Sequence, residues 1–254
     1  MSPARDWDGA TYDRISAPQQ AWGREVVDRL PLQGDETVLD AGCGSGRVTE
    51  MLRARLPHGR VIAVDASPSM VASARERLGP EVDVRVMDLV DLDLEQPLDA
   101  ILSTATFHWI ADHERLFSRL HAALRAGGRL VAQCGGEGNV RRTRMAAQAV
   151  GAQEPFAEYM AGWDGPWNFS PAGLAQQRLL AVGFHEARCW LVPASVEPPE
   201  PREFLRTVSL GSHLLRLPDD LRESFVEAVH ERLGDPYTID YVRLNIDAVA
   251  SGSG

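Results

Sequence analysis

One segment limits the fold of this chain more than any other, the glycine-rich stretch Val38-Leu39-Asp40-Ala41-Gly42-Cys43-Gly44-Ser45-Gly46. It lies between a predicted strand at 37–40 and a stretch at 46–56 whose apolar residues share one helical face. A proline and a glycine then interrupt the pattern before an apolar, β-branched run at 61–64. Strand, helix and strand in this order predict a βαβ unit with parallel strands.

The same alternation continues, which predicts an α/β protein with helices on both faces of a parallel sheet. The second half is richer in helix and ends on a strand, and no internal repeat is present. Helices are predicted at 19–30, 69–78, 114–124, 141–160 and 171–182, with a mostly helical segment up to 233. Strands are predicted at 82–87, 98–103, 129–134, 184–192 and 237–249.

Composition and charge exclude several classes of function. The 254 residues are 44% hydrophobic and 24% charged, as in globular proteins, and 26 basic against 36 acidic side chains give a net charge of −10. Such a surface disfavours nucleic acids and anionic membranes as partners. The three cysteines include no C-x-x-C pair, so we expect no metal. Without an apolar run of membrane-spanning length we expect a cytoplasmic protein, and 251–254 resemble a linker.

The spacing of the glycines indicates which kind of nucleotide the turn binds. A dinucleotide fingerprint, G-x-G-x-x-G, would need its third glycine at the position of Arg47, so NAD is disfavoured. The pattern is instead D-x-G-x-G-x-G. Asp65 ends the next predicted strand, where an acidic side chain can accept hydrogen bonds from ribose hydroxyls.

With these motifs the chain resembles the class I S-adenosylmethionine-dependent methyltransferases. Val86-Met87-Asp88-Leu89 matches the element that contacts adenine in this family, and 124–130 matches its L-x-P-G-G turn with Ala126 in place of proline. The resemblance implies a Rossmann-like α/β fold with a mostly parallel seven-stranded sheet of order 3-2-1-4-5-7-6. It implies a single domain over 1–250, with a cofactor-binding core at about 30–135 and helical lid insertions at about 141–170 and 200–235.

Within that family, the resemblance extends to the subgroup of trans-aconitate and juvenile hormone acid methyltransferases. Trp7-Asp8-Gly9-Ala10-Thr11-Tyr12 and Gln19-Gln20 are similar to its N-terminal segment, and Phe107-His108-Trp109-Ile110 is similar to its motif beside the transferring methyl group. The helical segment between the last two strands is similar to its substrate lid.

The resemblance also implies a set of site residues and a cofactor, S-adenosyl-L-methionine, with no metal. Asp65 would hold the ribose, and Asp88 the amino group of adenine. His108 would be catalytic. Residues implied to bind the acceptor are Gln19, Gln20, Trp109, Trp163 and Trp167. Residues implied to bind the cofactor are Tyr12, Asp40, Gly42, Gly44, Gly46, Asp65, Ala66, Met70, Asp88, Leu89 and Ser103.

The function that follows is methyl transfer to an oxygen, a carboxylate in our interpretation, of a small molecule. The aromatic and aliphatic residues of the lid favour an acceptor with apolar surface, and we expect a monomer or homodimer. His108 would orient an acid, or take the proton from a hydroxyl. Two alternatives remain open: methylation of nitrogen or carbon, and a protein that binds S-adenosylmethionine without transferring its methyl group.

Overall fold

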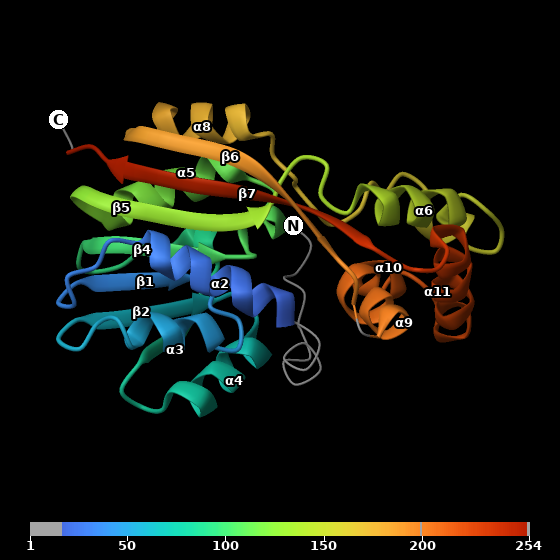
Figure 1. Ribbon diagram of the computed structural model, residues 1–254, viewed down its shortest axis with the longest axis horizontal. Coiled ribbons are helices and arrows are strands. Elements are labelled where there is room, and N and C mark those ends of the chain that lie inside the picture. Colours follow the sequence, from blue (N-terminus) through green and yellow to red (C-terminus); the bar gives the residue numbers. More distant parts are fainter. Residues whose placement is uncertain (1–16, 199, 253–254) are drawn as a thin grey trace. The chain divides into compact units, whose positions relative to one another are not determined.

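The computed structural model describes residues 17–198 and 200–252, with side chains from residue 21 onward. The chain divides into two compact units, labelled by their elements in Figure 1. We call them the sheet unit, which consists of the described residues up to Glu137 with Asn168–Val192 and Arg243 onward, and the helical unit, which consists of Gly138–Trp167 and Pro193–Val242.

Within the described residues, the strands form one seven-stranded sheet in the order β3-β2-β1-β4-β5-β7-β6, which confirms the predicted topology. Neighbours from β3 to β5 are parallel, and β7 is antiparallel to β5. The carboxyl ends of β1, β2 and β4 therefore lie at one edge. The strands are β1 (Thr37–Ala41), β2 (Arg60–Asp65), β3 (Asp83–Val86), β4 (Leu98–Thr104), β5 (Leu124–Gly135), β6 (Phe184–Val196) and β7 (Ile239–Ala250).

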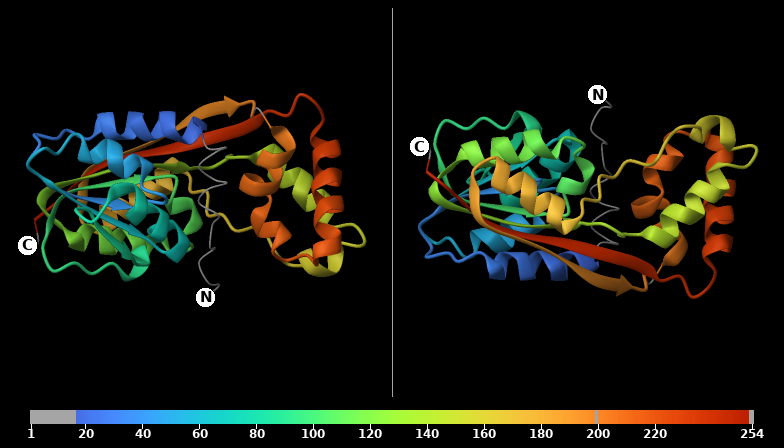
Figure 2. Two further views of the ribbon diagram at one scale, coloured as in Figure 1. Left: turned by 90° about the horizontal axis from the view of Figure 1, so that it is seen from below. Right: turned by 90° about the horizontal axis from the view of Figure 1, so that it is seen from above.

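Helices cover both faces of the sheet, as Figure 2 shows from two sides. The helices that belong to the sheet unit are α2 (Ala17–Arg29), α3 (Arg47–Arg53), α4 (Pro68–Leu78), α5 (His113–Ala123) and α8 (Ala172–Ala181), with short 3-10 turns η1 (Leu89–Asp91) and η2 (Phe107–Trp109). Residues of α2 and α3 pack with Val38 and Leu102 on one face. Residues of α5 and α8 pack with Leu39 and Ile101 on the other.

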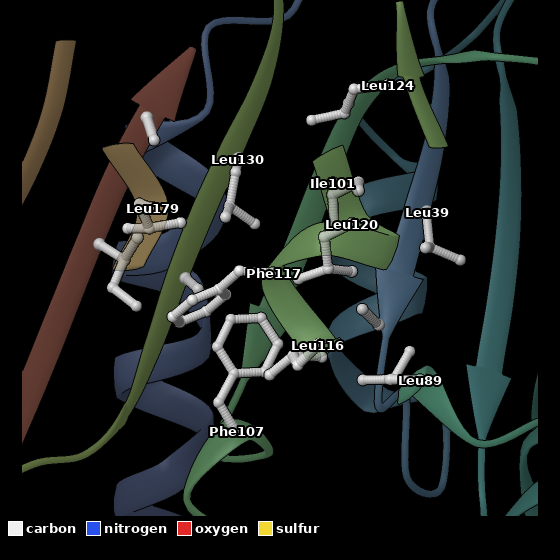
Figure 3. Close-up of a cluster of buried hydrophobic side chains, with 14 of the residues drawn as sticks. Leu39, Leu89, Ile101, Phe107, Leu116, Phe117, Leu120, Leu124, Leu130 and Leu179 are labelled. Atoms are coloured by element: carbon white, nitrogen blue, oxygen red, sulfur yellow. The ribbon is translucent and has the colours of Figure 1, made fainter. Parts of the chain in front are cut away.

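The core between α5 and the sheet explains why this helix forms and where it lies. Its buried stripe consists of Leu116, Phe117 and Leu120, each fully inaccessible to solvent, and Figure 3 shows them facing the sheet. Phe117 meets Phe107 of η2 edge to face, with ring centroids 5.9 Å apart. Burying each such side chain stabilises the fold by about 1.5–3 kcal/mol. This packing anchors η2, and therefore His108, at the end of β4.

The helical unit contains α6 (Arg141–Gly151), α7 (Ala157–Met160), α9 (Pro201–Phe204), η3 (Leu205–Ser209), α10 (Gly211–Leu214) and α11 (Asp219–Leu233). The single helix predicted at 141–160 is wrong: α6 ends at Gly151, and a turn with Pro155 separates it from α7. Proline lacks the N–H that a helix interior needs. Across residues 17–198 and 200–252, no helix is both long and apolar enough to cross a membrane.

Candidate functional site

The glycine turn follows β1 and bends back toward β2. The N–H groups of Gly42 and Cys43 both donate to the carbonyl of Val64, at 2.8 and 2.9 Å. Gly42, Gly44 and Gly46 all have positive φ, at 85°, 53° and 84°, in the region that only glycine enters freely. The turn is therefore held by backbone bonds to the neighbouring strand.

Two of these glycines serve different purposes. A Cβ atom built on Gly42 would lie 2.1 Å from Oγ1 of Thr106, so the absence of a side chain lets the turn pack against the loop after β4. Among the residues that the structure describes, a Cβ atom built on Gly44 would meet nothing within 4 Å. The backbone at Gly44 therefore borders open space, where a ligand can approach it.

Asp65, the last residue of β2, borders the same turn. Its Oδ2 accepts the N–H of Gly44 at 2.9 Å, and its Oδ1 accepts the N–H of Ser67 at 2.9 Å. Burial raises the pKa of this carboxyl above its ordinary value, although the bonds from Ser67 and Gly44 oppose the shift. Because each carboxylate oxygen has a further lone pair, Asp65 can hold the turn and also accept ribose hydroxyls.

Asp40 lies beneath the turn and is fully buried. Its Oδ2 accepts the hydroxyl of Thr49 at 2.6 Å, whereas Oδ1 has no hydrogen-bond partner among the residues that the structure describes. Burial raises the pKa of Asp40 to about 6. A buried carboxylate oxygen that lacks a donor suits a cationic ligand group. Together with the space at Gly44 and the position of Asp65, it fits an adenosine that carries an amino-acid end.

Among the remaining predicted cofactor residues, the polar side chains already make hydrogen bonds within the fold. The Asp88 carboxylate accepts the N–H of Val90 at 3.1 Å and caps η1. The Ser103 hydroxyl donates to the carbonyl of Ala41 at 2.6 Å, tying β4 to β1. Leu89 and Met70 are buried, and Ala66 follows Asp65 at the end of β2. Ser103 thus has a structural bond that its sequence position did not indicate.

His108 lies in η2 and is 7% exposed. Its Nδ1 accepts the N–H of Gly135 at 3.2 Å, its carbonyl accepts the N–H of Asn168 at 2.8 Å, and its ring stacks on Phe169 with centroids 5.7 Å apart. Burial lowers the pKa of His108 well below 6.5, and the positive charge of Arg243 lowers it further. A neutral imidazole whose Nδ1 accepts a bond carries its proton on Nε2. His108 is therefore a hydrogen-bond donor through Nε2.

The aromatic residues predicted to bind the acceptor belong to different parts of the chain. Trp109 is half-buried beside His108, with ring centroids 5.0 Å apart. Trp163 and Trp167 line a cavity of about 440 Å³ inside the helical unit, together with Arg144, Met160 and His213. The helix α2 contains the backbone of Gln19 and Gln20, whose side chains lie outside the described residues, as does Tyr12.

Three groups that shape the site were missed by the sequence analysis. Thr49 satisfies one oxygen of Asp40, Thr106 closes on Gly42, and the Gly135 backbone fixes the tautomer of His108. A threonine one turn into the helix after a glycine motif was a usable signal for the first. A backbone N–H leaves no trace in the residue pattern, so the role of Gly135 had no signal.

A mostly parallel sheet of this order, with a glycine turn after β1 and an acidic residue ending β2, defines a Rossmann-like protein that binds a nucleoside-containing cofactor. Comparison with known proteins narrows this class. Residues 38–128 match the family described as "Methyltransferase domain". Trans-aconitate 2-methyltransferase of Variovorax paradoxus is 32% identical over 239 residues, covering 92% of this chain and 91% of the relative.

The enzyme of the same name from Methylobacterium nodulans is 32% identical over 189 residues, covering 74% of this chain and 68% of the relative. Phosphoethanolamine N-methyltransferase 2 of Haemonchus contortus, solved with S-adenosyl-L-methionine, is 19% identical with a TM-score of 0.59, covering 92% of this chain and 53% of that one, which shows a shared fold. The chain belongs to the class I S-adenosylmethionine-dependent methyltransferases, in the subgroup of the trans-aconitate 2-methyltransferases. It is an enzyme, and its cofactor is S-adenosyl-L-methionine.

Proposed function

We propose that this enzyme transfers a methyl group from S-adenosylmethionine to a carboxylate oxygen of a small organic acid, such as the trans-aconitate for which its relatives are named. The observation that carries the proposal is the state of His108. Its Nδ1 is occupied by the Gly135 N–H, and its low pKa keeps the ring neutral, so Nε2 presents a proton. Such a group suits an anionic oxygen and is a poor base.

The residues around the glycine turn would hold the cofactor. Asp65 would accept the ribose hydroxyls, Asp40 the ammonium of the methionine end, and Asp88 the amino group of adenine. The space beside Gly44 would receive the adenosine next to the main chain. When bound, the cofactor would supply an electrophilic methyl group for the acceptor oxygen, with its sulfonium sulfur as the leaving group.

The chain's own contribution is then alignment and exclusion of water. A carboxylic acid with a pKa near 4 is ionised at neutral pH and needs no base. His108 would donate from Nε2 to the carboxylate oxygen that does not attack, while Trp109 and Phe169 hold the imidazole in place. Aligning the attacking oxygen in this way is worth about 7–11 kcal/mol when fully preorganised. The prediction that the acceptor also has apolar surface belongs to this proposal.

An acceptor screen with the wild-type enzyme tests the proposal. Carboxylic acids, phenols and amines of similar size would be incubated with S-adenosylmethionine, with S-adenosylhomocysteine release and product mass as readouts. We expect acids to give methyl esters, identified by their release of methanol in mild base. Turnover confined to phenols or amines would reject the carboxylate. Tight cofactor binding without product from any acceptor would favour a protein that does not transfer the methyl group.

A further inference from the structure

His108 is held by residues from both ends of an inserted segment. The first part of the helical unit, Gly138–Trp167, leaves the sheet unit after β5 and returns to it at Asn168. Before the departure, the N–H of Gly135 donates to Nδ1 of His108 at 3.2 Å. After the return, the ring of Phe169 stacks on the imidazole, with an interplanar angle of 25°. The two ends therefore fix the side chain of His108 together.

The two ends of the inserted segment are also joined to each other. The N–H of Glu137 donates to the carbonyl of Ser170 at 3.1 Å, and Ser170 is buried. The residues just before and just after the inserted segment are thus linked by a main-chain hydrogen bond. The contacts that reach His108 from Gly135 and Phe169 come from segments that are tied together.

Asn168 binds the backbone of η2 directly. Its backbone N–H donates to the carbonyl of His108 at 2.8 Å. Its side-chain Nδ2 donates to the carbonyls of Ile110 and Ala111, at 3.2 and 3.0 Å. An asparagine amide has two N–H hydrogens, so one is available for each of these carbonyls. Because carbonyls at the end of a helical turn lack partners within the turn, Asn168 satisfies groups that η2 itself cannot.

The two halves of η2 are anchored differently. The first half is fixed to the core, because Phe107 packs against Phe117 and Nε2 of His113 donates to the carbonyl of Phe107 at 2.9 Å. The second half, from the carbonyl of His108 onward, receives its three hydrogen bonds from Asn168. Since the first anchor does not involve Asn168, loss of the Asn168 amide should let His108 shift while η2 stays attached to the fold.

We propose that Asn168 is a positioning residue for methyl transfer, which fixes the main chain of η2 so that the imidazole of His108 meets the acceptor in one orientation. The inference rests on the proposed function, in which Nε2 of His108 donates to the acceptor. Asn168 acts through His108 and needs no contact with the acceptor itself. A displacement of about 1 Å between reacting groups can lower a rate by up to about 100-fold, so holding η2 in place contributes to turnover beyond its contribution to folding.

A double-mutant cycle tests whether Asn168 acts through His108. Asn168→Asp keeps the size of the side chain but replaces the two N–H donors with a carboxylate that faces two carbonyls. We expect kcat to fall about tenfold, which is no more than the loss in His108→Phe, and the affinity for S-adenosylhomocysteine to stay unchanged. In the double variant, kcat should equal that of His108→Phe within about twofold, because an imidazole that is absent cannot be misplaced.

Losses that multiply in the double variant would overturn the inference, because Asn168 would then act independently of His108. The matched control is Gln177→Glu, which makes the same change from amide to carboxylate at an exposed position of α8. It should show wild-type kinetics. If Asn168→Asp does not fold, Asn168→Ala takes its place in the cycle, since it removes the same two donors without adding a charge.

The tautomer of His108 gives a readout that needs no acceptor. Nitrogen-15 NMR of the histidine-labelled wild type should show one fixed tautomer with its proton on Nε2, assigned by the absence of its signal in His108→Phe. In Asn168→Asp we expect exchange between two tautomers, because the bond from Gly135 to Nδ1 weakens as η2 shifts. An unchanged His108 signal would overturn the inference. If no acid is methylated, the proposed function fails, whereas the NMR result still decides whether Asn168 positions His108.

Discussion

At the scale of single residues, the tautomer of His108 decides between orienting an acid and removing a proton. We expect methylation of an acid acceptor to be independent of pH from about 7 to 9, because neither His108, whose pKa is held well below 6.5, nor Asp40, with a pKa of about 6, titrates there. His108→Phe keeps the stacking on Phe169 but removes the donor, and kcat should fall about 10- to 100-fold. Steady-state kinetics across this pH range, with calorimetry of the cofactor product, measure both.

The matched variant is His108→Gln, which retains a side-chain N–H. It should keep more activity than His108→Phe, and both should bind S-adenosylhomocysteine as the wild type does. A rate that rises with pH in the wild type and is lost equally in both variants would instead identify His108 as a base.

At the scale of elements, two glycines of the turn between β1 and α3 have different roles: Gly42 is needed for stability, and Gly44 for cofactor binding. Gly42→Ala should lower the free energy of unfolding by about 2–5 kcal/mol, from the left-handed backbone and the clash with Thr106. Gly44→Ala should lower the free energy of unfolding by only about 1–2 kcal/mol, because only its left-handed backbone conformation is strained. Its methyl group fills the open space, so affinity for S-adenosylhomocysteine should fall at least about tenfold. Urea unfolding and calorimetry measure the two effects.

Gly79→Ala is the control for this comparison. Gly79 also has a positive φ, 73°, and a Cβ atom built on it would meet no described residue within 4 Å, but it caps the end of α4. The Gly79→Ala variant should be destabilised at least as much as Gly44→Ala, because φ 73° with ψ 179° is a conformation that essentially only glycine adopts. It should bind the cofactor product normally. Wild-type affinity in Gly44→Ala would show that the adenosine does not pass this backbone.

At the scale of the whole molecule, buried histidines set how stability depends on pH. Burial lowers the pKa of His213 to about 4, below its unfolded value near 6.5. The contribution of neutral His213 to the free energy of unfolding is therefore complete above pH 6.5 and is lost as the pH falls toward 4. The loss amounts to about 2 kcal/mol at pH 5. The variant His213→Phe can preserve the stacking on Phe225. Between pH 7.5 and 5, its free energy of unfolding should fall by about 2 kcal/mol less than that of the wild type.

Tryptophan fluorescence during urea unfolding can follow this effect, since Trp163 lies edge-on to His213 at 4.8 Å. Asp40 acts in the opposite direction, because its raised pKa favours the folded state below about pH 6. Because Asp40 is present in both proteins, its contribution cancels when the free energy of unfolding of the variant is subtracted from that of the wild type. His185→Asn, at an exposed position, should show the wild-type pH dependence. An unchanged slope in His213→Phe would show that His213 is not buried as described.

Much of the fold of the sheet unit could be predicted from the sequence, because residue patterns within short segments indicate its strands and helices. Apolar runs and glycine spacing placed β1, α3 and β2, and Asp65 falls at the turn because β2 is parallel to β1 and adjacent to it. The placement of β7 between β5 and β6 came from the family resemblance. The state of His108 could not be predicted, since it depends on a main-chain donor from β5.

Arg243 left a signal that was not used. Arg243, Asn245 and Asp247 are polar at alternate positions of a predicted buried strand, which places them on one face. Their bonds to Gln133 and Arg29 show that this face carries a polar layer where apolar residues are expected. The break between α6 and α7 was also missed, since helical periodicity alone does not show that α6 ends at Gly151, before the turn that contains Pro155.

The single carbonyl of Val64 that receives two N–H groups from the glycine turn has a consequence for engineering. The same stretch of β2 that anchors the turn also carries Asp65. The two parts of the proposed nucleoside-binding surface, the glycine turn and Asp65, are therefore positioned by one strand. A substitution on β2 that shifts Val64 would therefore displace the glycine turn and Asp65 together.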